Sequence, residues 1–228
     1  LIASPAWTAE PIVTNGDTLI LNGAFLRLHG IDAPNTDQTC LDSTGAAWRC
    51  GIEARERLKR HIGAREVRCD DQGSDPNHPK RRFAICRIEG EAISLNQWLV
   101  REGWAMNLEP SAPGRFVADQ DNARENRKGM WSGCFVSPLT LRRGTRATAK
   151  LLGASCPTGN TWSARGTLFP DRPTMPPGCA IKGKITARSQ ITSHRGIYHL
   201  ESCRSHARTA NPERWFCSED EARAEGFR

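Results

Sequence analysis

The dipeptide Asn22-Gly23 constrains the fold of this chain more than any other feature of its sequence. It separates two short apolar runs, residues 18–21 and 25–28, and such a dipeptide between apolar runs is the strongest short-range signal of a β-hairpin. Asp17 lies just before the first run, and Asp32 lies just after the second. Because a hairpin brings its two ends together, we expect these carboxylates to meet and to hold one hard cation through oxygen.

Arg27 lies on the returning strand, five residues before Asp32, within reach of anything that such a cation holds. Two carboxylates, a cation and a guanidinium group suit the charge that develops on a phosphoryl group under attack. The hairpin is therefore a candidate site for phosphoryl chemistry.

Five short sequence motifs lie along the first part of the chain. They are Gly16-Asp-Thr18, Arg27-Leu-His-Gly-Ile-Asp-Ala-Pro34, Arg81-Arg-Phe-Ala84, Leu99-Val-Arg-Glu-Gly-Trp-Ala105 and Gly129-Met-Trp131. In their order and spacing they resemble the staphylococcal nuclease-like (thermonuclease) family over roughly residues 10–140. The resemblance implies a five-stranded OB-fold β-barrel with three helices, an α+β fold.

The periodicity of apolar residues agrees with this order of elements. It predicts strands within residues 11–31, 66–69 and 82–88 and helices over residues 46–62, 94–106 and 114–128, with Ser94 as an N-cap. The residues between 34 and 45 are polar and are expected to form a loop.

The resemblance also assigns roles to residues of the hairpin. Asp17 and Asp32 match the calcium-binding carboxylates of the family, and Ala33 stands where a backbone carbonyl joins them. Arg27 matches one of the two arginines that hold the scissile phosphate and neutralise its transition state. For either aspartate alone, a role in a turn would be the simpler explanation.

Arg81 matches the second arginine of the family. We choose it over Arg82 because the family pattern places an alanine three residues later, and Ala84 is there. The alternative is a solvated basic face, since Lys80, Arg81 and Arg82 are consecutive.

Two positions depart from the family pattern. The general-base glutamate is replaced by Asn35, and the outer aspartate is replaced by Asn15. Fewer carboxylates weaken calcium binding, and loss of a general base typically costs about 10²–10⁴-fold in rate. We therefore expect an impaired nuclease, with Asp37, or less plausibly Glu53, as a substitute base.

Charge and hydropathy restrict the partners. The 228 residues carry a formal net charge of +7, which favours a polyanion such as DNA or RNA. No apolar run is long enough to span a bilayer, so membrane insertion is not expected. The small apolar residues at the start are consistent with the remnant of a secretory segment or with a chain boundary.

The nine cysteines indicate an oxidising compartment. Cys40 and Cys50 bracket a short loop, and Cys69 and Cys86 lie on neighbouring predicted strands, so these four are disulfide candidates. No Cys-x-x-Cys pair occurs, which disfavours a zinc ribbon. The sequence therefore predicts a periplasmic or secreted bacterial protein with at least one cysteine left over.

The chain divides into three predicted parts. Residues 1–140 form the nuclease-like domain, and residues 141–178, rich in proline and glycine, form an extended linker or a loosely packed arm. Residues 179–228 form a small module with strands near 180–185, 196–200 and 214–217.

This C-terminal module resembles a small module of bacterial secreted proteins. It ends in a short helix that Ser218 is expected to cap. About fifty residues bury little core unaided, so a disulfide among Cys179, Cys203 and Cys217 is expected, with zinc binding as the weaker alternative.

Three functions remain open. The first is calcium-dependent cleavage of DNA or RNA at a reduced rate, which the retained carboxylates and arginines favour. The second is binding of nucleic acid or another polyanion without catalysis. The third is an accessory role in exopolysaccharide or envelope biosynthesis, with an acidic polysaccharide as partner; Asn35 and Asn15 favour the second and third.

Overall fold

The chain folds as an α+β protein. The computed structural model describes residues 6–76, 78, 80–108, 114–143, 149–157, 162–170, 173–186 and 194–228. The helices are α1 (Cys50–Ile62), α2 (Leu95–Arg101), α3 (Val117–Glu125), a 3₁₀ turn (Gly129–Ser132), α4 (Pro138–Arg143), α5 (Trp162–Leu168), α7 (Arg204–Arg208) and α8 (Glu219–Ala224). The strands are β1 (Ala6–Ala9), β2 (Ile12–Asn15), β3 (Thr18–Leu21), β4 (Ala24–Leu28), β5 (Ile31–Asp32), β6 (Cys40–Leu41), β7 (Ala47–Trp48), β8 (Val67–Ser74), β9 (Arg81–Ile88), β10 (Met106–Asn107), β11 (Phe135–Val136), β12 (Leu151–Leu152), β13 (Ile181–Lys184), β14 (Ile197–His199) and β15 (Arg214–Phe216).

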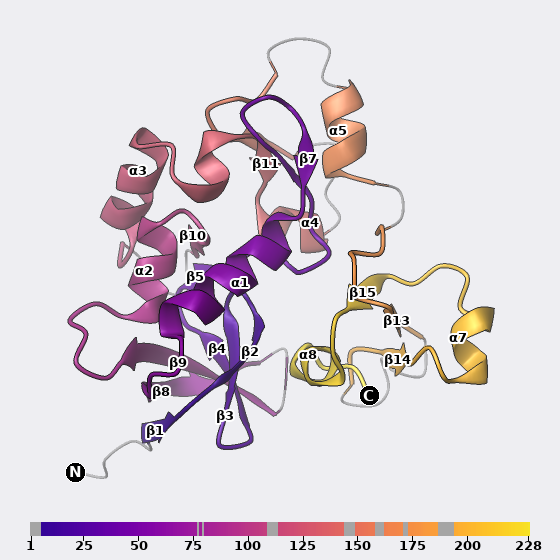
Figure 1. The fold of residues 1–228 in the computed structure, drawn as a ribbon, viewed down its shortest axis with the longest axis horizontal. Coiled ribbons are helices and arrows are strands. Elements are labelled where there is room, and N and C mark those ends of the chain that lie inside the picture. Colours follow the sequence, from indigo (N-terminus) through magenta and orange to yellow (C-terminus); the bar gives the residue numbers. More distant parts are fainter. Residues whose placement is uncertain are drawn as a thin grey trace.

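The main sheet contains the predicted hairpin. Its described strands follow the order β1-β8-β9-β4-β3-β2, with β4 parallel to β9 and all other neighbours antiparallel (Figure 1). The turn between β3 and β4 has positive φ at Asn22 (50°) and Gly23 (78°), as a two-residue hairpin requires. Its register pairs Thr18 with Arg27, so Asp17 lies at the open end of the hairpin beside Arg27. The sheet is larger than the five strands expected, because β1 pairs with β8 at one edge.

Apolar side chains of this sheet and of two helices form the main core. Strand β3 is buried along its whole length, and Leu58 and Ile62 of α1 belong to the same cluster. Leu99 of α2 joins them. The Ser94 hydroxyl accepts a bond from the backbone N–H of Gln97 at 3.1 Å, which confirms the predicted N-cap of α2.

Three helices are shorter than the sequence predicts, and α2 ends at Arg101 instead of near residue 106. Helix α1 starts at Cys50 instead of residue 46, because β6 and β7 form a small hairpin before it that the Cys40–Cys50 disulfide closes. Helix α3 covers Val117–Glu125 instead of residues 114–128. Gly114 and Arg127 have positive φ, 71° and 50°, a conformation that does not continue an α-helix.

The described parts of residues 141–178 pack against the first region, in contrast to the loosely packed arm that the composition suggested. Leu168 and Phe169 are buried in one cluster with Leu41 and Cys134, and β12 pairs with β11. A disulfide from Cys134 to Cys156 joins the two parts. Proline and glycine here mark turns between short packed elements rather than a free tether.

The C-terminal module consists of a three-stranded antiparallel sheet, in the order β14-β13-β15, with α7 and α8. Ser218 caps α8 by accepting a bond from the backbone N–H of Glu221 at 3.1 Å, as predicted. Figure 1 shows α8 beside the main sheet, next to β2. The last helix of the chain therefore lies against the strand that leads into the hairpin.

Four disulfides join cysteines of the described segments: Cys40–Cys50, Cys69–Cys86, Cys134–Cys156 and Cys179–Cys217. The first two join the pairs that the sequence placed together. Cys203 is free and exposed, which accounts for the odd count. None of the helices described is both long and apolar enough to cross a membrane.

Candidate active site

The hairpin brings the two predicted carboxylates to a single guanidinium group. Arg27 Nη2 lies 3.2 Å from Asp17 Oδ2 and 3.1 Å from Asp32 Oδ1. Asp17 is held further by the Thr18 hydroxyl at 3.0 Å and by the backbone N–H of Ala33 at 3.3 Å. The ends of the hairpin thus bring the two acidic groups together, as the sequence pattern predicts, while their contacts with Arg27, Thr18 and Ala33 are seen only in the structure.

Asp32 has a second cationic partner that the sequence did not reveal. Arg142 of α4 donates a hydrogen bond to Asp32 Oδ1, the same oxygen that Arg27 contacts. The other oxygen, Asp32 Oδ2, is buried and has no hydrogen-bond partner among the described residues. Burial raises the pKa of Asp32, while the guanidinium groups of Arg142 and Arg27 act in the opposite direction. Its ionised form therefore depends on neighbouring cations.

Arg81 and Arg82 have different surroundings. Arg81 is buried, with Nη2 2.8 Å from Asp75 Oδ2 and with Nη1 donating to the backbone carbonyl of Ala224 at 2.9 Å. Arg82 instead pairs with Asp71 and is more exposed. Of the two consecutive arginines, Arg81 lines a cavity with Arg27.

A carboxylate from the C-terminal module lies among the arginines of this site. The oxygens of Glu225 lie 3.8 Å from Arg81 Nη1, 3.4 Å from Arg195 Nη1 and 3.8 Å from Arg214 Nη1. Burial opposes the charge, yet Arg81, Arg214, Arg195 and Arg27 hold the pKa of Glu225 below its usual value. The pKa shift thus favours the ionised form of Glu225, which lies beside Arg81, one of the two arginines of the family resemblance.

The positions considered for the general base lack a free carboxylate. Asn35 is buried at the edge of the same cavity. Asp37 Oδ2 accepts hydrogen bonds from Arg214 Nε at 2.8 Å and from the backbone N–H of Trp215 at 3.3 Å. Glu53 pairs on the surface of α1 with Arg57. Of these, only the Asn35 side chain lines the cavity that holds Arg27.

The cavity of about 540 Å³ gathers most of the site predicted from the sequence. Asp17, Arg27, Asn35 and Arg81 all line it. Asp32 and Ala33 are buried behind them, with only 2% and 1% of their surface exposed. The arrangement suits an anion held by arginines next to a pair of carboxylates.

Sequence reasoning missed several charged residues that line this cavity, among them Arg142, Arg195 and Glu225. These three come from α4 and from the C-terminal module, and they lack a local motif. The only signal in the sequence is the net positive charge, which does not name positions.

The chain is similar to a known family model and to a known protein. The family model described as staphylococcal nuclease homologue matches residues 25–133. The chain is also 33% identical over 137 residues to the succinoglycan biosynthesis protein ExoI of Rhizobium meliloti (strain 1021), which covers 58% of this chain and 70% of that relative. The family match includes Arg27, Asp32 and Arg81 but neither Arg142 nor Glu225. These similarities confirm the resemblance seen in the motifs, and the chain belongs to the staphylococcal nuclease homologue family.

Proposed function

We propose that this protein is a slow, calcium-dependent phosphodiesterase that acts on DNA or RNA. One observation carries the proposal: Arg27 and Arg81 line a single cavity, and Arg27 contacts both Asp17 and Asp32. The cavity thus combines two guanidinium groups for a phosphodiester with two carboxylates for a cation.

In this proposal the two arginines hold the non-bridging oxygens of the phosphate. Water adds to phosphorus as the bond to the leaving oxygen breaks; the attacking water loses its proton to solvent, and the leaving oxygen takes one from solvent. The negative charge that develops on the phosphate lies between the two arginines. Loss of an arginine with this role costs on the order of 10³–10⁵-fold in rate. Asn35 can orient the attacking water through its amide oxygen, but it cannot accept a proton from it at neutral pH.

The carboxylates fit a calcium ion by their chemistry. Asp32 Oδ2 is a buried oxygen without a partner among the described residues, and calcium takes oxygen ligands. Asp17, Asp32 and the carbonyl of Ala33 would hold the ion, which stabilises charge on the phosphate when bound. No cluster of three or more His, Cys, Asp or Glu side chains suited to a metal is found in the described segments, so weak binding is expected.

The C-terminal module gives a second reason for a low rate. Glu225 pairs with Arg81 and Arg195, so a substrate phosphate must displace a carboxylate that already compensates these guanidinium groups. Because a buried ion pair is broken in the exchange, substrate affinity falls. We therefore expect slow turnover and weak binding together.

The proposal is tested by cleavage of denatured DNA and of RNA with calcium or with a chelator. We expect slow, chelator-sensitive cleavage that is lost in Asp32→Ala and that rises by about 10²–10⁴-fold in Asn35→Glu, which restores the general base. Asp71→Ala is the matched control, since Asp71 pairs with Arg82 away from the cavity. If neither the natural chain nor Asn35→Glu cleaves, the phosphodiesterase proposal is wrong.

A second candidate is an accessory role in exopolysaccharide biosynthesis. The relative named a succinoglycan biosynthesis protein supports it, as does the amide at the general-base position. Binding of an acidic polysaccharide, with indifference to nucleic acid, would favour this candidate. Salt-sensitive binding of nucleic acid without cleavage would favour a polyanion-binding protein instead.

Three further expectations belong to the same proposal. The main sheet closes into the OB-fold barrel of the family, and the chain divides at residues 140 and 178 as the sequence predicts. The protein works in the periplasm or outside the cell, because four disulfides among the described residues are typical of oxidising compartments.

A further inference from the structure

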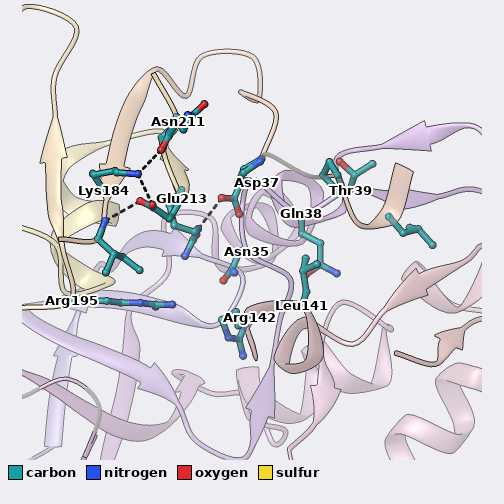
Figure 2. Close-up of a pocket in the computed structure, with 16 residues that line it drawn as sticks. Asn35, Asp37, Gln38, Thr39, Leu141, Arg142, Lys184, Arg195, Asn211 and Glu213 are labelled. Carbon is teal, nitrogen blue, oxygen red and sulfur yellow. Dashed lines mark hydrogen bonds and ion pairs between the residues drawn. The ribbon is translucent and has the colours of Figure 1, made fainter. Parts of the chain in front are cut away.

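Two further cavities lie next to the candidate site, and they differ in whether their charges are compensated. Figure 2 shows the larger one, of about 530 Å³. Each cation among its described lining residues has an acidic partner; the pairs are Arg142–Asp32, Lys184–Glu213, Arg195–Glu225 and Arg214–Asp37. The lining of this larger cavity therefore offers little attraction for an anion from solution.

The smaller cavity, of about 300 Å³, lies where the C-terminal module meets the hairpin, and we call it the module cavity. Its volume is at the lower end of the range of about 300–1,000 Å³ that is usual for small-molecule sites. Six of its nine lining residues lie outside residues 25–133, so the part of the chain that matches the family does not build it alone. The described lining residues are Phe25, His78, Lys80, His194, Tyr198, Arg223, Gly226, Phe227 and Arg228.

Aromatic rings from three segments contribute to this lining. Phe25 of β4 and Tyr198 of β14 are partly exposed, so their rings are accessible to a ligand. Phe227 is buried and packs against Phe216, with 4.9 Å between the ring centroids. Proteins commonly bind nucleobases by stacking them on such rings. The walls of the module cavity therefore suit a flat, aromatic ligand.

The module cavity also has accessible positive charge. None of its described lining residues is acidic, and Arg223 is compensated outside the cavity by Glu219 at 2.9 Å. The exposed side chain of Lys80 has no ion pair or hydrogen bond with any described residue, and the same holds for the guanidinium group of Arg228. A lysine in this position can bind a phosphate as a point charge.

His78 fixes the backbone from which the Lys80 side chain projects. The backbone N–H of Lys80 donates to His78 Nδ1 at 3.3 Å, so Nε2 carries the ring proton and donates to the carbonyl of Arg223 at 3.1 Å. The imidazole is buried and joins the loop before β9 to the end of α8. Because the backbone is already ordered, binding at Lys80 loses little chain entropy.

The position of the module cavity relates it to the candidate site. The cavity of about 540 Å³ that holds Arg27 and Arg81, the arginine cavity, shares none of its described lining residues. Phe25 lies two residues before Arg27 on β4, so their side chains leave the same face of the sheet about 7 Å apart. Gly226 of the module cavity directly follows Glu225 of the arginine cavity. A strand with one phosphate in the arginine cavity can therefore place a neighbouring nucleotide in the module cavity.

We propose that the module cavity binds one nucleotide of a nucleic-acid strand, with its base against Phe25 and Tyr198 and its phosphate at Lys80. The proposal rests on the proposed function in taking nucleic acid as the ligand, but it concerns binding and requires no cleavage. Because every base has a face that can stack, we expect little preference among bases.

The test follows the ring signals of Tyr198 by NMR in the full chain labelled on tyrosine, with a chelator present to suppress cleavage. The sequence contains one tyrosine, so a single set of ring signals reports on the cavity. The probes are adenosine monophosphate, adenosine, inorganic phosphate, glucose 1-phosphate and a single-stranded tetranucleotide. We expect adenosine monophosphate to shift the signals saturably and to bind at least about threefold more tightly than adenosine and tenfold more tightly than phosphate or glucose 1-phosphate. The tetranucleotide should shift the same signals.

Variants at two positions report on the lining. Phe25→Leu keeps an apolar side chain but removes the ring, so adenosine monophosphate should bind at least about fivefold more weakly, whereas Phe25→Tyr keeps the ring and should bind it within about twofold of the natural chain. Lys80→Gln should weaken binding of adenosine monophosphate by about two- to fivefold and leave binding of adenosine unchanged, because adenosine has no phosphate. Lys59→Gln is the matched control, since Lys59 is exposed on α1 and does not line the cavity.

Each contrary outcome overturns the proposal in a different way. Equal binding of glucose 1-phosphate and adenosine monophosphate would indicate a sugar-phosphate site. A shift with adenosine monophosphate that the tetranucleotide neither produces nor competes away would indicate a site for a free nucleotide. Absence of a Tyr198 shift with every probe would overturn the proposal even if the chain cleaves DNA. A saturable shift in a chain that cleaves neither DNA nor RNA would support the proposal, and only the proposed cleavage would then be wrong.

Discussion

The nuclease-like region and the C-terminal module are held in place by different forces. In the described part of the chain, the main core of the first region contains nineteen buried apolar side chains, whereas the module has only Phe216, Ala222 and Phe227. The module depends instead on the Cys179–Cys217 disulfide and on polar contacts with the first region. Its small core cannot supply much stability unaided.

Those polar contacts converge on the candidate site. Glu221 accepts a hydrogen bond from Thr36, Arg214 pairs with Asp37, and the end of α8 contacts Arg81. The first region therefore supplies the residues that resemble a nuclease site. The module supplies charged side chains that pair with residues in and beside that site. Four predictions test this division, from the largest expected effect to the smallest.

The largest effect is expected at Arg81, where the two regions meet. In an Asn35→Glu background, Arg81→Ala should lower kcat/KM for denatured DNA by about 10³-fold or more, because a guanidinium group on the phosphate is lost. Arg82→Ala is the matched control and should change it by less than about tenfold, since Arg82 pairs with Asp71 at the surface. Equal losses in both variants would contradict the assignment of Arg81, provided circular dichroism shows both folded.

Disulfide removal should separate the two regions. Chain entropy predicts a loss of about 4 kcal/mol for Cys179→Ser with Cys217→Ser and about 3 kcal/mol for Cys69→Ser with Cys86→Ser, from sequence separations of 38 and 17 residues. Hydrogen exchange should show the module opening alone in the first variant, because its core is small. Concerted opening of the whole chain would show that the two regions form one cooperative unit.

The stability of the module should depend on pH through Glu221. Burial raises the pKa of Glu221 from 4.5 to about 7 in the folded chain. The folded state therefore keeps a proton that the unfolded state releases, and the free energy of unfolding should fall by on the order of 3 kcal/mol as pH rises from about 4.5 to about 7.

Glu221→Gln should remove most of this fall, because the amide can still accept from the backbone N–H of Cys217 and donate to the Thr36 hydroxyl. Urea unfolding at pH 5 and pH 7 measures the difference. An unchanged slope in Glu221→Gln would assign the pH dependence to other groups.

The smallest effect is expected at Glu225. Glu225→Gln keeps the shape of the side chain but removes the anion that competes for Arg81 and Arg195, so a single-stranded oligonucleotide should bind about tenfold more tightly, equal to about 1.4 kcal/mol. Glu219→Gln is the control, an acidic residue of α8 that pairs with Arg223 at the surface. Weaker binding in Glu225→Gln would mean that this carboxylate supports the site instead of occupying it.

Local sequence determined the part of the site that lies on one hairpin. The turn at Asn22 requires positive φ, which fixes the register of β3 and β4 and so brings Asp17, Arg27 and Asp32 together. The caps Ser94 and Ser218 were predictable for the same reason, because a capping side chain bonds to a backbone group three residues away.

Only the tertiary structure decided which groups occupy that site. Asn15 bonds to Glu225 across 210 residues of sequence, Arg142 reaches Asp32 across 110, and Arg214 reaches Asp37 across 177. No periodicity or motif marks such pairs, because they depend on how the module and α4 dock on the sheet. Sequence patterns predict contacts between residues that are close in the chain. The charged side chains of Arg142, Arg214 and Glu225 come from distant segments, and only tertiary packing places them at this site.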